Sequence, residues 1–320
     1  MESFMSSDEN QFVNADTHKN KCIHIFCYHG LGDVIRFAIP VAHAFHRSGA
    51  EVFLHTRSVL ASTIGQQPEG INIAAVTDDF VSSNGGAEKA MQILFAQLPK
   101  PNLAIGLGGS FFDVEAAKFL QRNSIDYWGG KCDTSNPNFD ASISWLNTME
   151  VDKSRNKLFR LLRLPNIDPK EVLINPQPIE TFTLPEGTVG LHTKAMWPSR
   201  CYNQGPKLLE LLKNKYNVWN FDNPPCKSIA DLACHIKQSK AVLSVDTMVI
   251  HLCNALNVPS LMIQGPVWHH PDNAPNVIEF TRTTKAPISN HQIDKQSDEL
   301  SKIAPERIMK AFEFFLDKLD

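Results

Sequence analysis

An acidic residue at the start of a predicted helix is the first position at which this sequence could carry out chemistry. Asp33 follows Gly30 and Gly32, between an apolar run at 21–28 and a stretch with helical spacing at 33–47. The glycines allow a tight turn and a close approach of a ligand to backbone amides at a helix start. Asp33 could cap the helix or act as a general base on an attacking hydroxyl. The partial positive charge of the helix start favours the ionised carboxylate that a base requires.

A second candidate site follows the apolar run at 188–193. Thr193 and Lys194 stand at the predicted strand end, where they could hold phosphate oxygens. A lysine ammonium there would offset the negative charge that develops on a leaving diphosphate. Trp197 and Pro198 then open the next helix, and the indole is a candidate platform for a ligand. A solvated lysine and a core tryptophan remain the open alternatives.

A third candidate site joins the end of one strand to the start of a helix and to the end of the next strand. Its assigned residues are Asp246, Thr247, Met248, His251, Gly265 and Pro266. The helix-start amides and the Thr247 hydroxyl could bind an anion without a glycine loop. His251 lies three and four residues past Met248 and Thr247, so the three share one helix face. A structural role for His251 stays open.

Apolar runs of strand length alternate with amphipathic helical segments, first over 21–130 and again over 188–281. This alternation predicts an α/β fold with parallel sheets covered by helices on both faces. The predicted strands are 21–28, 51–56, 71–76, 102–109 and 124–130, then 188–193, 216–221, 241–246, 258–264 and 276–281. The predicted helices are 33–47, 86–98 and 111–121, then 203–215, 227–239, 247–256 and 304–319, the last with an apolar stripe at Ile308, Phe312, Phe315 and Leu319.

Five of the 20 prolines lie between 165 and 185, which is typical of a linker. We therefore expect four segments. They are a flexible leader (1–20), an N-terminal Rossmann-like domain (21–164), a Pro-rich linker (165–187), and a C-terminal Rossmann-like domain (188–320). Two such domains leave a cleft between the carboxyl ends of their sheets, where ligands of open α/β sheets bind.

Composition excludes several classes of protein. The chain has 320 residues, 42% of them apolar, and 31 basic against 34 acidic side chains give a net charge of −3. That balance gives no support to nucleic-acid binding. The apolar runs are far shorter than the roughly 20 residues of a membrane span, and residues 1–20 lack the basic and apolar regions of a signal peptide. We expect a soluble, cytoplasmic protein, and peripheral contact with the inner membrane stays open.

Metal and disulfide frameworks are not predicted. The seven cysteines are odd in number and contain no Cys-x-x-Cys pair, and Cys22 and Cys27 are interpreted as small core residues. No Asp-x-Asp occurs in the chain, and the adjacent side chains of His269 and His270 would diverge. We expect neither a metal nor another cofactor.

A basic stripe within 151–165 indicates where an anionic acceptor could bind. Lys153, Lys157 and Arg160 follow helical i, i+4, i+7 spacing and are interleaved with leucines. Such a stripe could meet phosphates or carboxylates on a glycan, on lipopolysaccharide core, on a protein or at a membrane surface. An ordinary amphipathic helix with a solvated face is the alternative.

These motifs together resemble the family 9 glycosyltransferases, the lipopolysaccharide heptosyltransferases, which are two-domain enzymes of the GT-B type. The resemblance is carried by Gly30-Leu31-Gly32-Asp33, by Lys194 with Trp197-Pro198, and by Asp246-Thr247, His251-Leu252, Ala255-Leu256, Pro259 and Gly265-Pro266. It implies Asp33 as the catalytic base and Thr193 and Lys194 at the donor phosphates. It also implies that the 246–251 helix start grips the diphosphate and sugar. By the same resemblance, the N-terminal domain binds the acceptor and the C-terminal domain binds the nucleotide sugar.

The sequence departs from the family where Met248 replaces a glycine, where Lys194 stands three residues before Trp197, and at 267–271. The leading hypothesis is an inverting, metal-independent transferase that moves a sugar, in this family a heptose from a donor such as ADP-heptose, to an acceptor hydroxyl. Two alternatives stay open: a nucleotide-sugar epimerase of GT-B architecture and a catalytically inactive nucleotide-binding protein.

Overall fold

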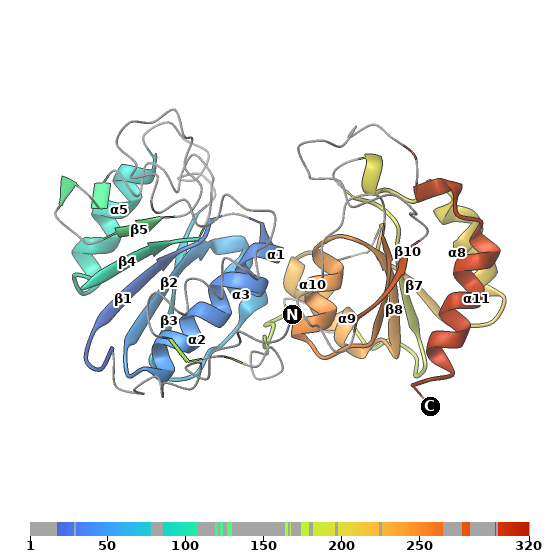
Figure 1. Ribbon diagram of the computed structural model, residues 1–320, viewed down its shortest axis with the longest axis horizontal. Helices are drawn as coiled ribbons and strands as arrows, with labels where there is room; N and C mark the ends of the chain where they lie inside the picture. The colour runs from blue at the N-terminus through green and yellow to red at the C-terminus, as the bar shows by residue number, and fades with distance from the viewer. Residues whose placement is uncertain are drawn as a thin grey trace, which may run out of the picture.

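Two α/β units, each built on a parallel sheet, make up the part of the chain that the structure describes (Figure 1). The structure is a computed structural model. It describes residues 18–28, 30–77, 86–107, 119–120, 122–123, 127–129, 164–165, 167, 174–178, 182–195, 198–223, 226–264, 277–281, 298 and 300–319. The two sheets confirm the predicted α/β class. The limits of the four predicted segments remain a prediction.

The first sheet has the strand order β3-β2-β1-β4-β5. Its strands are β1 (Cys22–Phe26), β2 (Glu51–Arg57), β3 (Ile71–Val76), β4 (Leu103–Gly106) and β5 (Tyr127–Gly129). The central strand β1 pairs in parallel with both β2 and β4. Its side chains are buried on both faces from Ile23 to Phe26, because helices cover both sides of a parallel sheet. Cys27 is buried as predicted, whereas Cys22 is only half-buried at the strand start.

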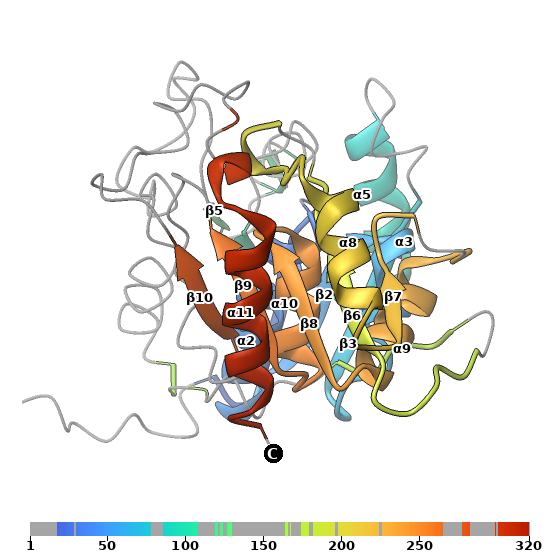
Figure 2. The ribbon, with the colours of Figure 1, turned by 90° about the vertical axis from the view of Figure 1, so that its right-hand side faces the viewer.

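The second sheet has the strand order β10-β9-β8-β6-β7. Its strands are β6 (Val189–His192), β7 (Val218–Asn220), β8 (Ala241–Val245), β9 (Ser260–Gln264) and β10 (Val277–Thr281). Helices α8 (Gly205–Lys213) and α11 (Pro305–Leu316) cover one face, and α9 (Ile229–Gln238) and α10 (Met248–Ala255) cover the other (Figure 2). In the predicted stripe of α11, Ile308, Phe312 and Phe315 are buried. Leu319 is 39% exposed, because the helix ends at Leu316.

The predicted helix at 33–47 is divided into three parts. The short helix α1 (Leu31–Asp33) leads into the π-helical turn η1 (Val34–Ala38), and α2 (Ile39–Arg47) follows. Pro40 has no amide hydrogen to give an ordinary i−4 bond, and the Ile39 N–H instead donates to the Val34 carbonyl, five residues back. The irregular turn therefore stands directly after Asp33.

Helices of both units pack against each other through one apolar core. It contains Ile35, Leu60 and Ile64 from the first unit and Leu232, Ile236, Val249 and Leu252 from the second. The helix α3 (Ser58–Ile64), which the sequence analysis missed, lies against α9, and α1 and η1 lie against α10 (Figure 1). The two units are thus joined by buried apolar surface and not only by the chain between them.

Residues 174–177 tie the two units together by backbone hydrogen bonds. The Ile174 N–H donates to the Ala255 carbonyl at the end of α10, at 3.2 Å, and the Asn175 N–H donates to the Ile64 carbonyl at the end of α3, at 3.1 Å. Gly65 forms a bridge with Asn175 at φ +70°, and a Cβ atom at Gly65 would overlap the Asn175 carbonyl. Only glycine fits this position.

Two histidines are buried together in the first sheet. His55 Nε2 lies 3.0 Å from His24 Nδ1, and the His24 ring stacks on Phe95 at a centroid distance of 5.3 Å. Burial lowers the pKa of His24 to about 4. Burial also lowers the pKa of His55, and electrostatic repulsion from the neighbouring His24 lowers it further. Both rings are therefore neutral near pH 7.

We expect acid to destabilise this unit through the two histidines. Their folded-state pKa values lie below the unfolded value, so the unfolded chain takes up more protons as the pH falls below about 6.5. The His24 shift alone lowers the free energy of unfolding by about 2 kcal/mol between pH 7 and pH 5. Urea unfolding at both pH values should show this loss in the wild type and in His46→Gln, and a smaller loss in His24→Gln/His55→Gln. Equal losses in all three proteins would contradict the prediction.

No helix among the described residues is long and apolar enough to cross a bilayer.

Candidate active site

The loop after β1 carries Asp33 at the carboxyl end of the first sheet. Gly30 occupies the N-cap position of α1 in extended conformation, and Asp33 is the third residue of that helix. Gly30 and not Asp33 is therefore the N-cap of α1, and Asp33 precedes η1 without a side-chain cap hydrogen bond to that turn. The Asp33 side chain is half-buried, and its Oδ2 would lie 3.9 Å from a Cβ atom at Gly30. The glycine thus keeps the space beside this carboxylate open.

The second unit reaches this loop through His251. A Cβ atom at Gly32 would stand 2.8 Å from His251 Cδ2, so the imidazole packs directly on the Gly32 backbone. Any larger residue at 32 would have to displace the ring. The sequence placed Gly32 and His251 at two separate sites, and the structure brings them into contact one residue away from Asp33.

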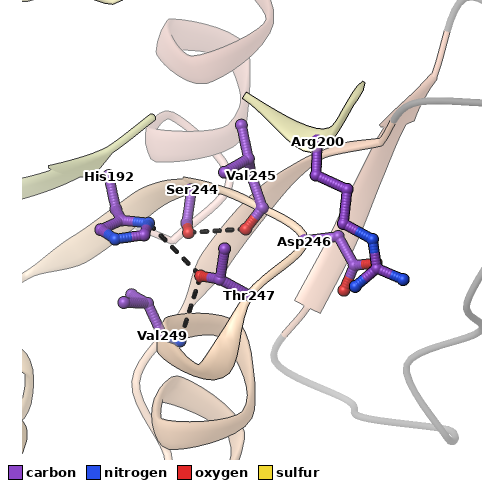
Figure 3. Close-up of polar contacts among 7 residues, drawn as sticks. All are labelled: His192, Arg200, Ser244, Val245, Asp246, Thr247 and Val249. Carbon is purple, nitrogen blue, oxygen red and sulfur yellow. Dashed lines mark hydrogen bonds and ion pairs between the residues drawn. The ribbon is translucent and has the colours of Figure 1, made fainter. Parts of the chain in front are cut away.

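Thr247 caps the helix that carries His251. It follows β8 in extended conformation, and its hydroxyl accepts a hydrogen bond from the Val249 N–H at 3.3 Å. The same hydroxyl oxygen lies 3.3 Å from His192 Nδ1 at the end of β6 (Figure 3). Burial lowers the pKa of His192, and the cation of Lys194 adds to this effect, whereas the carboxylate of Asp222 opposes it. A neutral His192 ring can accept a hydrogen bond from the Thr247 hydroxyl.

These bonds change what the α10 start can offer an anion. The Val249 N–H and the Ile250 N–H both donate to Thr247, to its hydroxyl and its carbonyl respectively. The partial positive charge of the helix start remains. The predicted anion site at Thr247 and Met248 therefore depends mainly on the partial positive charge of the helix start and on neighbouring cations. It depends less on the Val249 and Ile250 amides, which already donate to Thr247. The Met248 side chain is half-buried at the first helical position.

Asp222, just after β7, organises the loop that carries Lys194. Its carboxylate accepts hydrogen bonds from the Thr193 N–H at 2.6 Å, the Thr193 hydroxyl at 2.5 Å and the Lys194 N–H at 2.9 Å. Thr193 is buried and Lys194 is exposed. The Thr193 hydroxyl is thus used inside the protein, and Lys194 is the group of this pair that faces solvent.

Asp246 forms an ion pair at the end of β8. Its Oδ2 lies 3.6 Å from Arg200 Nη1, and Arg200 belongs to the short 3-10 turn Pro198–Arg200. The two side chains are only 8% and 21% exposed, with Asp246 the more buried. Figure 3 shows the pair on the side of the β8 end away from His192. Two carboxylates and two cations thus surround the carboxyl ends of β6, β7 and β8.

Several predicted site residues lie outside the described part of the chain. They are Trp197, Gly265, Pro266, Lys153, Lys157 and Arg160, together with His269 and His270. Within the described residues no group of three or more His, Cys, Asp or Glu side chains is arranged to hold a metal ion.

Sequence reasoning missed Asp222, Arg200 and His192. Asp222 directly follows the predicted strand 216–221, and the strand-end rule that selected Asp246 could have found it. His192 lies inside a predicted strand and Arg200 inside a predicted helix start, so neither carried a separate signal.

Comparison with known proteins gives a fold and no sequence relative. No family model matches the chain, and no curated protein matches it by sequence. Solved structures of glycosyltransferases share its fold. A family 9 glycosyl transferase from Veillonella parvula has a TM-score of 0.66 at 15% identity, covering 95% of this chain and 99% of that one. The Escherichia coli heptosyltransferase WaaC with ADP-2-deoxy-2-fluoro heptose has a TM-score of 0.61 at 14% identity, covering 92% and 99%.

The third structure is the iron-containing dodecameric glycosyltransferase TibC from enterotoxigenic E. coli. Its TM-score is 0.54 at 9% identity, covering 95% of this chain and 78% of that chain. The chain therefore has the two-unit fold of these glycosyltransferases over nearly its whole length, as the resemblance in the sequence predicted.

Proposed function

We propose that this protein is an inverting glycosyltransferase that moves a sugar from a nucleotide-diphosphate donor to an acceptor hydroxyl. The observation that carries the proposal is the contact of His251 with Gly32. It brings the start of α10, at the carboxyl end of the second sheet, next to Asp33 at the carboxyl end of the first. The shared fold with three glycosyltransferases supports it.

In this mechanism the second unit holds the donor. Lys194 and the start of α10 carry the positive charge that stabilises the departing diphosphate. Asp33 of the first unit removes the proton of the acceptor hydroxyl as that oxygen attacks the anomeric carbon. Attack on the face opposite the diphosphate inverts the anomeric configuration. Gly30, Gly32 and His251 shape the space where the two substrates meet.

The proposed donor is ADP-heptose, because the fold is shared with a heptosyltransferase that was solved with an ADP-sugar analogue. The proposed acceptor is a glycan, lipopolysaccharide core or a protein, and the proposed location is the cytoplasm or the inner membrane surface. The net charge of −3 makes nucleic acid a poor acceptor. No cofactor other than the donor substrate takes part in this proposal.

A donor screen tests the function and separates it from its alternatives. The protein is incubated with ADP-, UDP- and GDP-sugars, with and without acceptor, and the products are read by mass spectrometry. We expect slow donor hydrolysis alone and faster donor consumption with acceptor. A new epimer without acceptor would indicate an epimerase. Binding with no turnover under any condition would indicate a nucleotide-binding protein.

We expect transfer to persist after treatment with EDTA. The protein's own cations at the donor phosphates replace the divalent ion that other sugar-nucleotide enzymes need. The measurement compares initial rates before and after chelation and after adding back Mg²⁺ or Fe²⁺. The iron-containing TibC makes iron the ion to test first. A rate that falls on chelation and returns with either ion would contradict metal independence.

The basic stripe gives a prediction for the acceptor. Replacing Lys153, Lys157 and Arg160 together with Gln should raise the acceptor KM several-fold at low salt and leave the donor KM unchanged. Low salt is used because exposed charges are screened over about 8 Å at physiological salt. The effect should shrink as salt is added. If neither the acceptor KM nor its salt dependence changes, the stripe is solvated surface.

A further inference from the structure

The ion pair between Arg200 and Asp246 leaves hydrogen-bonding capacity unused inside the protein. Asp246 is 6% exposed, and its Oδ2 is buried and makes no hydrogen bond to the residues that the structure describes. The separation of 3.6 Å from Arg200 Nη1 allows Coulomb attraction but is too long for a good hydrogen bond. A buried carboxylate oxygen in this state is costly unless a donor group reaches it.

The place of the pair indicates which ligand would use that capacity. Asp246 directly precedes Thr247, the N-cap of α10, so the pair stands at the positive end of this helix. It also lies at the carboxyl end of the sheet, where Lys194 follows the adjacent strand β6 and Asp222 follows β7, the next strand along. Next to a guanidinium, a ligand there would meet a buried acceptor oxygen that has no hydrogen-bond partner among the described residues. A sugar linked to phosphate offers the matching groups, a hydroxyl and an anionic oxygen.

We propose that Arg200 is a second cation for the donor, in addition to Lys194, and that it works with Asp246 as one unit. In the free protein Arg200 compensates the Asp246 carboxylate. With the donor bound, Arg200 donates to a phosphate oxygen while Asp246 Oδ2 accepts from a donor hydroxyl. This inference rests on the proposed function, because it assumes that the donor binds at this edge of the second sheet.

The charge balance explains why one lysine is not sufficient. Asp222 and Asp246 bring two negative charges to the strand ends, and Lys194 and Arg200 cancel them. Without Arg200, the buried Asp246 carboxylate would repel a diphosphate at the same helix start. A planar guanidinium can also contact a carboxylate and a phosphate at the same time, which an ammonium does less well.

Isothermal titration with ADP, UDP and GDP tests the inference, using whichever the wild type binds most tightly. The variants are Arg200→Gln, Arg200→Lys, Asp246→Asn and Arg200→Gln/Asp246→Asn. Lys207→Gln is the matched control, since it removes the same charge from an exposed ion pair with Glu306. We expect about ten-fold weaker binding in Arg200→Gln, a smaller loss in Arg200→Lys, and no loss in the control.

The double variant separates binding from structure. Urea unfolding of Arg200→Gln should show a loss of stability, because an uncompensated charge stays buried, and the added Asp246→Asn change should restore it. Nucleotide affinity should recover only in part in the double variant, because the repulsion by Asp246 is gone while the contact from Arg200 to the phosphate is still missing. Full recovery of both stability and affinity would mean that the pair is only structural, and wild-type affinity in Arg200→Gln would overturn the inference while the proposed function stands. A wild type that binds none of the three nucleotides would contradict the proposed function itself.

Discussion

Asp33→Asn should lower the rate of sugar transfer by about 10²–10⁴-fold and leave donor affinity nearly unchanged. The amide has nearly the shape of the carboxylate but cannot take a proton from the acceptor hydroxyl. Asp33 lies in the first unit, whereas the groups proposed to hold the diphosphate lie in the second, so the loss should fall on kcat. Initial rates at saturating donor, together with titration of the donor nucleotide, measure the two effects separately.

Glu51→Gln is the matched control for this variant. Glu51 is exposed at the first residue of β2, at the amino end of the same parallel sheet, so its change removes one carboxylate far from the site. Transfer by this variant should equal that of the wild type. If Asp33→Asn transfers sugar at a similar rate with an unaltered fold, Asp33 only supports the α1 start.

Lys194→Ala should weaken binding of the donor nucleotide by about 1.5–3 kcal/mol, which is roughly 10–150-fold in Kd. The Asp222 carboxylate fixes the backbone on both sides of Thr193 and so directs this exposed ammonium from a rigid loop. A charge that is held in place loses little entropy when it meets a phosphate. Titration of the nucleoside diphosphate against wild type and variant measures the effect.

Lys213→Ala removes an equally exposed ammonium from the last turn of α8 and should leave the affinity unchanged. If Lys194→Ala binds every nucleotide as the wild type does, the diphosphate does not lie at the end of β6.

The sheets could be predicted from the sequence because parallel strands are buried on both faces. Largely apolar runs such as 241–246, which contains the fully buried strand β8, therefore mark the central strands clearly, whereas the edge strand β3 exposes Asn72 and Ala75. Helix α3 could not be predicted in the same way. It has only seven residues, Ser58–Ile64, three of them hydroxylated and two β-branched aliphatic, and it is stabilised by packing against α9 of the other unit.

Lys194 and Asp246 could be selected as candidate residues because each stands at the end of its own predicted strand. Asp33 was selected because it follows a glycine turn after a strand, and Asp222 stands at a strand end as well but was missed. The partners that hold Lys194 and Asp246 come from distant positions: Asp222 is 28 residues from Lys194, and Arg200 is 46 residues before Asp246. The contact between Gly32 and His251 joins the two units, and only the packing of α1 against α10 creates it. Spacing along one chain contains no signal for such pairs.

The anomeric configuration of the product tests the central claim most directly. The wild-type protein is given ADP-heptose labelled with ¹³C at the anomeric carbon, together with a lipopolysaccharide core acceptor, and the new glycosidic bond is read by NMR. An inverting transferase with Asp33 as its base predicts a product of the opposite anomeric configuration to the donor, formed by the wild type and by Glu51→Gln and almost absent with Asp33→Asn. A product that retains the donor configuration, or one that Asp33→Asn forms as fast as the wild type, would contradict the account.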